Sequence, residues 1–311
     1  MSTPSASPVE ETLAWESEFR SRTVLASIVG GFLVLAGGVA LAIVLHGLPR
    51  TGVLDAIRAA AGQPLSVGPG LRTAQLQFYD NRAAGLLATY VVQGFGAILT
   101  AATLGYLFRA TKARRPELPR AALYGAVVGP VMLGISLIAQ GVAFAIEVHH
   151  FISKHDLSTK AAHDALNGGV LLGTQVLHTA ASLAVAFAFV LVSINAMRVG
   201  VITRFMGVLG AIVGALFVLP LGSSFLVQSF WMISFGLMLL GRLPSGIPPA
   251  WEAGVAVPWP TQQELREQRG EVQAPKTPAK SPPAAAGDVD GEAAPKTVAH
   301  SSSKKRKRKH R

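Results

Sequence analysis

The chain has 311 residues, half of them hydrophobic, and a formal net charge of +11 at pH 7. It contains no cysteine, which excludes disulfides, thiolate metal sites and cysteine nucleophiles. Long apolar runs combined with a high charge are typical of a polytopic membrane protein whose charges lie in loops and tails.

The first 22 residues precede the apolar runs and carry a helix start signal. Ser7 and Glu10 form a capping box, with Pro8 at the first helical position. This pattern predicts a short cytoplasmic helix in the segment 1–22, with Trp15 and Phe19 at the membrane interface.

Six apolar runs then follow within a predicted transmembrane domain, residues 23–241. The first four exceed the roughly 20 residues that a helix needs to cross a ~30 Å bilayer core. The last two are shorter and share a turn at 220–223, so they form either a hairpin of two full spans or a re-entrant pair. We favour full spans and expect an all-α bundle of six spans at residues 24–46, 83–108, 121–146, 168–197, 201–219 and 224–240.

Basic residues predict the orientation. One side of the membrane would carry nine Lys and Arg before the last span and the other side six, and the remaining 13 of the 28 follow that span. Because basic loops stay in the cytoplasm, we expect a plasma-membrane protein with both termini cytoplasmic.

The long first loop, residues 47–82, is broken by Gly-Gln-Pro at 62–64 and Gly-Pro-Gly at 68–70. It predicts two short helices that lie on the outer leaflet. A lid over the bundle is the alternative.

Polar side chains recur at helical spacing inside the spans. They should face other helices, because burying an amide in hydrocarbon is costly unless the amide is hydrogen-bonded. Gln93 and His178 would lie about 15 Å from the outer ends of their spans. The cluster predicts either interhelical hydrogen bonds or a cavity, open to the outside, that binds a small solute. The candidate ligand-binding residues are Gln93, Gln140, Gln175, His178 and Gln228.

The loop between the third and fourth spans is rich in histidine. Imidazole and carboxylate groups are ligands for divalent transition metals, and Glu147 and His150 would share a helical face. The alternative is a solvated loop that ends in a helix cap at Asp156 or Ser158. The candidate metal ligands are Glu147, His149, His150 and His155.

The fifth run places small residues at steps of three and four: Gly207, Gly210, Ala211, Gly214 and Ala215. This pattern permits close approach of another helix. It predicts a packing helix and a possible surface for a homo-oligomer.

After the last span the composition changes twice. Residues 242–271 are Pro-rich and contain Trp251 and Trp259, which predicts a headgroup-level belt followed by a short helix. Residues 272–311 are rich in Ala, Pro, Lys, Ser and Gly, a composition that cannot bury enough surface to fold, so we expect a disordered tail.

The chain closes on a cluster of cations, and no aromatic residue is interleaved for base stacking. Anionic lipid headgroups are the expected partner, and non-specific binding of nucleic acid or a ribosome is the alternative. The candidate residues are Lys304, Lys305, Arg306, Lys307, Arg308, Lys309 and Arg311.

Four short motifs carry a resemblance to known sequences: SINAMR at 193–198, TRFMG at 203–207, PPAWE at 248–252 and VPWP at 257–260. With them, residues 20–270 or so resemble a group of uncharacterised polytopic membrane proteins of high-GC Gram-positive bacteria. The resemblance implies a bacterial plasma membrane and supplies no activity.

No pair of residues is spaced as a nucleophile and its base or as two catalytic acids, and the middle of each span lacks Asp and Glu. We therefore expect a protein that is not an enzyme and needs no cofactor. It would act as a scaffold or accessory subunit within the lipid bilayer. The alternative is a facilitator or receptor for a small solute.

Overall fold

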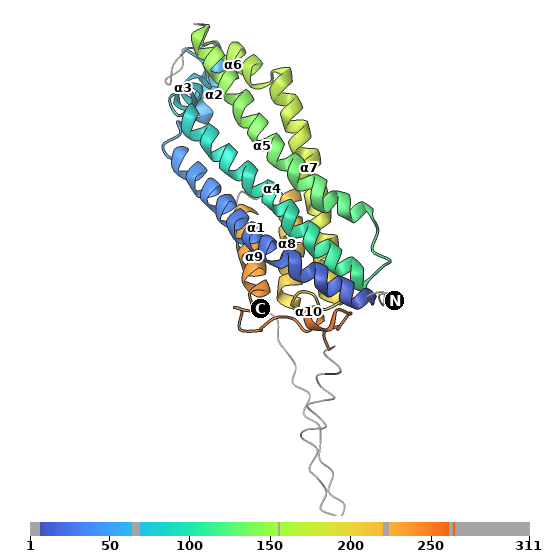
Figure 1. Cartoon of the computed structure of the whole chain (residues 1–311). Coiled ribbons are helices and arrows are strands. Elements are labelled where there is room, and N and C mark those ends of the chain that lie inside the picture. The colour runs from blue at the N-terminus through green and yellow to red at the C-terminus, as the bar shows by residue number, and fades with distance from the viewer. Residues whose placement is uncertain (1–6, 64–68, 155, 220–223, 261–263, 265–311) are drawn as a thin grey trace, which may run out of the picture. The chain divides into compact units, whose positions relative to one another are not determined.

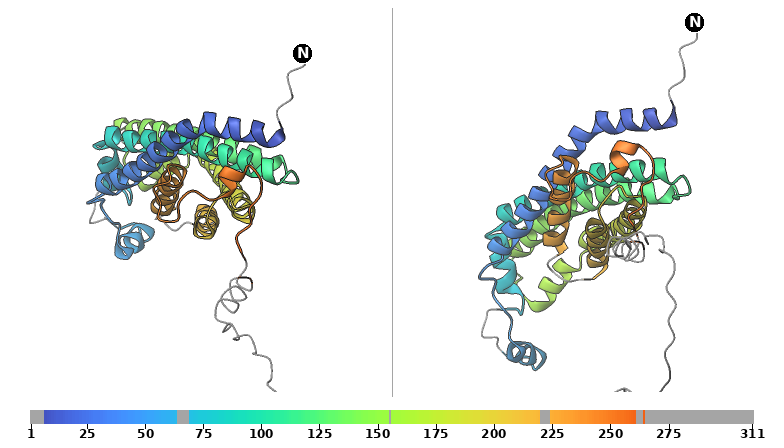
Figure 2. Two further views of the ribbon diagram at one scale, coloured as in Figure 1. Left: turned by 60° about the horizontal axis from the view of Figure 1, so that its bottom comes forward. Right: turned by 90° about the horizontal axis from the view of Figure 1, so that it is seen from below.

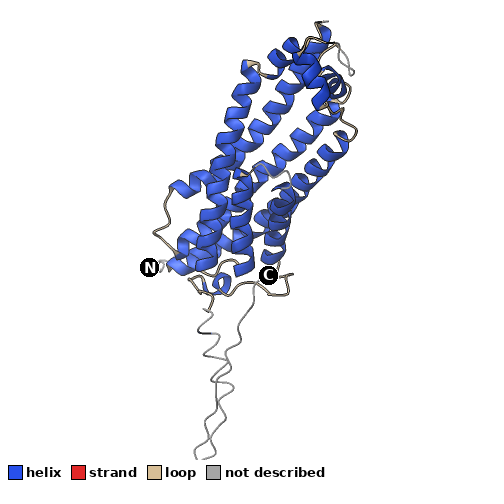
Figure 3. Ribbon diagram, turned by 180° about the vertical axis from the view of Figure 1, so that it is seen from behind, coloured by secondary structure: helices blue, strands red, loops and turns tan. Residues whose placement is uncertain are grey.

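The computed structural model describes residues 7–63, 69–154, 156–219, 224–260 and 264, and the regular structure in these ranges is helical (Figure 3). Within these ranges, four helices are long and apolar enough to cross a membrane: α1 (Pro8–Val44), α4 (Ala83–Arg114), α5 (Ala121–Ser153) and α7 (Gly169–Arg198). The helices are α1 Pro8–Val44, α2 Val53–Ala60, α3 Thr73–Asp80, α4 Ala83–Arg114, α5 Ala121–Ser153, α6 Thr159–Leu166, α7 Gly169–Arg198, α8 Arg204–Val218, α9 Ser224–Leu239 and α10 Ala250–Ala253.

Six helices close into a ring. α1 packs on α4, α4 on α5, α5 on α7, α7 on α8 and α8 on α9, and α9 returns to α1. Figure 1 shows α8 and α9 only in the half of the bundle near the N-terminal end of α1, and Figure 2 shows the same bundle from below. α8 and α9 therefore cover one half of the bundle, whereas α1, α4, α5 and α7 extend through both halves.

The prediction of six full spans is not confirmed, because α8 and α9 are short. They have 15 and 16 residues, or about 22 and 24 Å of helix against a bilayer core of about 30 Å. Phe225, at the start of α9, lies against Gly38 of α1. Gly38 is six residues before the end of α1, so α9 begins about 9 Å short of that end.

The predicted N-terminal helix is the first part of α1, which runs without interruption for 37 residues. The capping box is confirmed: the Ser7 side chain accepts from the Glu10 amide, and the Glu10 carboxylate accepts from the Ser7 amide at 2.8 Å. The first turns of α1 thus continue directly into the membrane helix.

A buried ion pair joins α1 to the end of α4. Glu16 and Arg114 form a bidentate contact, and their side chains are 1% and 0% exposed. The Arg114 guanidinium also donates to the carbonyl oxygens of Ala110 and Ala250, at 2.9 and 2.6 Å. A buried charge is tolerated only when it is paired and hydrogen-bonded, and this network meets that condition.

Trp251 lies in the protein interior, at 2% exposure, and its depth at the level of the lipid headgroups stays a prediction. Its side chain stacks on Tyr106 at 5.6 Å between ring centroids, and Tyr106 stacks on Trp15 at 5.1 Å. Its indole N–H donates to the Val201 carbonyl at 2.8 Å. A tryptophan whose N–H has a protein acceptor is stable in a core, which a composition-based assignment could not detect.

The chain after α9 folds back onto the α7–α8 turn. Gly200 has φ +77° there, a backbone that favours glycine. The Val257 amide donates to the Val199 carbonyl at 3.1 Å, and the Trp259 indole donates to Ile202 at 2.9 Å. The compact unit extends to Pro260 and so includes much of the predicted segment 242–271. Residues 261–311 form a second unit, of which only 264 is described, so the predicted tail 272–311 lies outside the described residues.

The small residues of α8 pack against α7 inside the chain. A Cβ at Gly207 would meet Met197, and one at Gly214 would lie 2.6 Å from the carbonyl oxygen of Ala186. The predicted packing helix is confirmed, and this glycine face is occupied by α7 rather than free for a second copy.

The short helices of the first loop have different surroundings. α3 packs on α5 and α6 through Leu76, and Tyr79 meets Phe144 edge-on at 5.1 Å. Burial raises the pKa of the Tyr79 hydroxyl. α2 instead exposes Val53, Leu54 and Ile57 on one face, as an interfacial helix would.

We expect Glu16→Gln to destabilise the protein by about 3–5 kcal/mol, because it leaves the Arg114 charge buried without a counter-charge. Glu18→Gln, at an exposed position of the same helix, is the matched control. Thermal unfolding in neutral detergent measures both. Equal midpoints for the two variants would show that the ion pair does not hold this end of the bundle.

Gly214→Val should cost about 1–3 kcal/mol, since the added side chain would force α8 away from the backbone of α7. Ala215→Val, on the exposed face of α8, should change little. Thermal unfolding in neutral detergent measures both variants. If Ala215→Val were the more destabilising of the two, the face of α8 that packs on α7 would be wrongly assigned.

Candidate functional site

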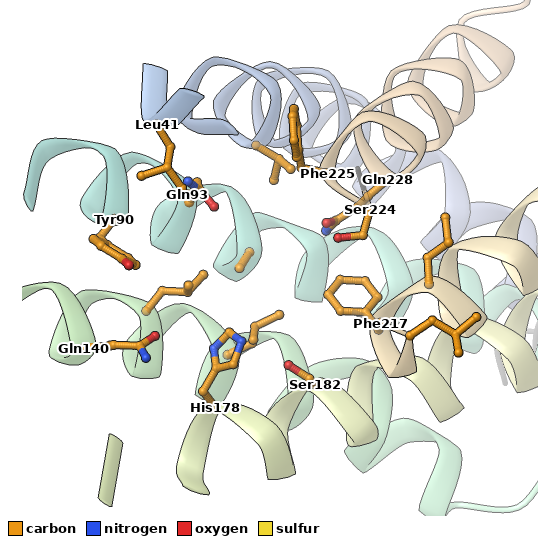
Figure 4. A pocket seen from close by; sticks show the side chains of 16 residues that line it. Leu41, Tyr90, Gln93, Gln140, His178, Ser182, Phe217, Ser224, Phe225 and Gln228 are labelled. Carbon is orange, nitrogen blue, oxygen red and sulfur yellow. The ribbon is translucent and has the colours of Figure 1, made fainter. Parts of the chain in front are cut away.

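A cavity of about 420 Å³ lies between the end of α8 and the start of α9 on one side and α1, α4, α5 and α7 on the other (Figure 4). Side chains from six helices line it, namely α1, α4, α5, α7, α8 and α9. α8 ends and α9 begins beside it, while the other four helices continue past it. The lining residues are Val34, Leu41, Tyr90, Gln93, Ala97, Leu133, Leu137, Gln140, His178, Ser182, Leu216, Phe217, Leu219, Ser224, Phe225 and Gln228.

The lining includes several polar side chains but, among the residues described, no acidic, Lys or Arg side chain. Figure 4 shows amides approaching from opposite sides, Gln93 from α4 and Gln228 from α9, with His178 of α7 facing them. Apolar groups such as Leu133 and Phe217 form the remaining walls. The arrangement can donate and accept hydrogen bonds to an uncharged group and can cover an apolar one.

Two of the amides already have side-chain partners. Gln228, 5% exposed, donates from Nε2 to Thr100 Oγ1 at 3.2 Å, and Thr100 in turn donates to the Gly96 carbonyl at 3.1 Å. Gln140 Nε2 donates to Gln175 Oε1 at 2.8 Å. His178 Nδ1 lies 3.4 Å from Ser136 Oγ, at the long end of a hydrogen bond. These contacts tie α4 to α9 and α5 to α7.

Gln93 differs from the other amides. Its Nε2 atom is buried and has no hydrogen-bond partner among the described residues. The side chain is held against α1 at Gly37, where a Cβ would collide with it. A buried donor without an acceptor costs about 1–3 kcal/mol, and a rotation of the amide that brings this N–H to an acceptor on a bound molecule would recover that cost.

Four of the five predicted ligand-binding residues therefore line one cavity: Gln93, Gln140, His178 and Gln228. Gln175 is exposed and reaches it only through Gln140. The spacing that placed these amides on interior faces was sufficient to find them. It missed Tyr90 and the hairpin residues Phe217 and Phe225, which enter the lining because of where the short helices end. The shortness of the last two apolar runs was the sequence signal that could have indicated these lining residues.

The predicted metal ligands do not form one cluster. His149 Nδ1 contacts Asp80 Oδ1 at 3.3 Å, whereas Glu147 and His150 line a separate cavity of about 340 Å³. No three His, Asp or Glu side chains of the described ranges are placed to hold a metal ion, and His155 lies outside those ranges.

The alternative reading of this loop as a capped helix start agrees with the structure. The Ser158 side chain caps α6 by accepting from the Ala161 amide at 3.2 Å. On the exposed face of α6, Lys160 pairs with Asp164 at 2.8 Å, which lowers the pKa of the Asp164 carboxyl.

Gln93→Met should leave stability unchanged or raise it by about 1 kcal/mol, because it removes a buried N–H without a partner. Gln228→Met should lower stability by a similar amount, since it breaks the bond to Thr100. Unfolding midpoints of the two variants, measured without added solute, test the difference. The opposite order would mean that Gln93 has a partner in the protein.

The remaining candidates, the seven cations between 304 and 311, lie outside the described residues.

Comparison with known proteins does not identify a family. No family model matches the chain, and no significant similarity is found to curated proteins or to solved structures. The resemblance to membrane proteins of high-GC Gram-positive bacteria therefore stays a prediction.

Proposed function

We propose that the chain is a plasma-membrane protein that binds a small, uncharged, hydrogen-bonding solute in the cavity above the α8–α9 hairpin, as a facilitator or receptor rather than an enzyme. The observation that carries the proposal is Gln93, whose buried Nε2 has no acceptor among the described residues and which lines that cavity.

The lining favours a neutral ligand. Amides, hydroxyls and an imidazole can satisfy both donors and acceptors, whereas no described lining residue supplies a full charge to offset that of an ion. The volume, about 420 Å³, is within the range of small-molecule sites. Apolar contacts with Leu137 and Phe217 would cover the less polar face of the solute.

The proposed topology places both termini in the cytoplasm. Arg109, Lys112, Arg115, Arg198 and Arg204 lie near the ends of α4 and α7 and the start of α8, the bundle end at which α1 begins. The lengths of α8 and α9 favour a re-entrant pair over two full spans. Either arrangement returns the chain to the side from which it left.

A second candidate function rests on the basic end of the chain. Seven of the eight residues 304–311 are Lys or Arg. Each such residue contributes about 1 kcal/mol near an anionic leaflet. A scaffold or accessory subunit would use this segment to hold lipid headgroups, or less specifically the phosphates of nucleic acid or a ribosome.

Thermal unfolding of the purified protein with a panel of polyols, sugars and small amides tests the first proposal. A solute that binds the folded state raises the midpoint by mass action. We expect the increase to disappear in Gln93→Ala and His178→Ala and to persist in Thr179→Ala, an exposed position of α7.

Removal of residues 304–311 separates the two proposals. It should leave the solute-dependent shift intact and should weaken sedimentation with anionic vesicles. A shift that survives both cavity variants would contradict the cavity as the site. Unchanged vesicle binding after the deletion would contradict the role of the basic segment.

A further inference from the structure

A second cavity, of about 730 Å³, lies at the N-terminal end of the bundle and shares no lining residue with the first. It is formed by the first half of α1, the last turns of α4 and the start of α5. Among its lining residues are Trp15, Arg22, Gly105, Arg109, Lys112 and Val127.

Three cations surround this cavity without a carboxylate partner. None of the ion pairs between described residues includes Arg22, Arg109 or Lys112. Arg109 lies over the Trp15 ring at 4.2 Å, and Lys112 donates to the Leu118 carbonyl at 2.7 Å, so both side chains are positioned but not neutralised. Arg114, in the same helix, is by contrast neutralised by Glu16, and its guanidinium also donates to the Ala110 carbonyl.

Apart from Thr23 and Tyr106, the other walls of the cavity are apolar. Gly105 of α4 faces α5, where a Cβ would lie 3.1 Å from Val127 Cγ2. Ala101, Ala102 and the exposed side chain of Leu123 continue the apolar surface. Because Gly105 and Ala101 precede Arg109 by one and two turns, the apolar part faces the middle of the bundle and the cations face its end.

We propose that this groove binds an anionic phospholipid of the cytoplasmic leaflet. The headgroup phosphate pairs with Arg22, Arg109 and Lys112, and an acyl chain lies over Gly105 between α4 and α5. Charge-assisted bonds from Arg to phosphate are strong, and basic pockets at the cytoplasmic ends of membrane helices suit such headgroups. The ligand differs from that of the uncharged cavity, so either site can exist without the other.

Native mass spectrometry of the full-length chain in neutral detergent tests the proposal, with equimolar phosphatidylglycerol and phosphatidylcholine as probes. The seven terminal cations are replaced by Gln in every sample, so that binding by that segment does not contribute. We expect phosphatidylglycerol to be retained in preference to phosphatidylcholine. Arg22→Gln with Arg109→Gln should weaken its binding at least about tenfold.

Two controls make the result specific. Arg58→Gln with Arg72→Gln changes the charge equally at exposed positions of the opposite end and should leave binding unchanged. Gly105→Leu should also lower retention by filling the groove, whereas Gly173→Leu, where an added side chain meets open space, should not. Equal retention of the two lipids, or undiminished binding in the Arg22 and Arg109 variant, would overturn the proposal.

Discussion

The buried contact between Glu16 and Arg114 determines how one end of this protein is assembled. It joins α1 to α4, and the same guanidinium binds the Ala250 carbonyl, which brings the chain after α9 to that end. Trp251 then links this segment to the α7–α8 turn through Val201. Three separate parts of the sequence therefore meet at one arginine, and the hairpin helices α8 and α9 are anchored on both sides. Because a buried charge is costly when unpaired, burial of the Arg114 guanidinium requires its contacts with Glu16 and the Ala250 carbonyl.

The anchored hairpin in turn shapes the uncharged cavity. α8 and α9 close the ring of helices at the anchored end, but they are too short to continue along the full length of α1 and α7. Close approach between the long helices keeps the remaining space small: a Cβ at Gly94 would lie 2.8 Å from the Gly134 carbonyl, so α4 and α5 nearly touch. What is left beside the end of α8 and the start of α9 is a space lined by amides and apolar side chains, with Gln93 at its wall.

The two proposed sites differ in their electrostatics, and the difference follows from their positions. In the cavity, neutral side chains avoid the cost of a charge deep among helices. In the groove near the N-terminal end, arginine and lysine lie where the apolar runs stop. One site therefore suits a neutral solute and the other an anionic headgroup.

Local information in the sequence was sufficient to predict where the helices lie and which residues form much of the candidate site. Hydrophobic runs and the box at Ser7 and Glu10 located α1, and helical spacing placed Gln93 and His178 on interior faces, because both signals depend only on neighbours along the chain. The pairing of Glu16 with Arg114 and the burial of Trp251 were decided by the tertiary structure. They join residues far apart in sequence, and no periodicity identifies which buried donor meets which acceptor. The tertiary structure also decided where α8 and α9 end relative to α1, and with it the existence of the cavity.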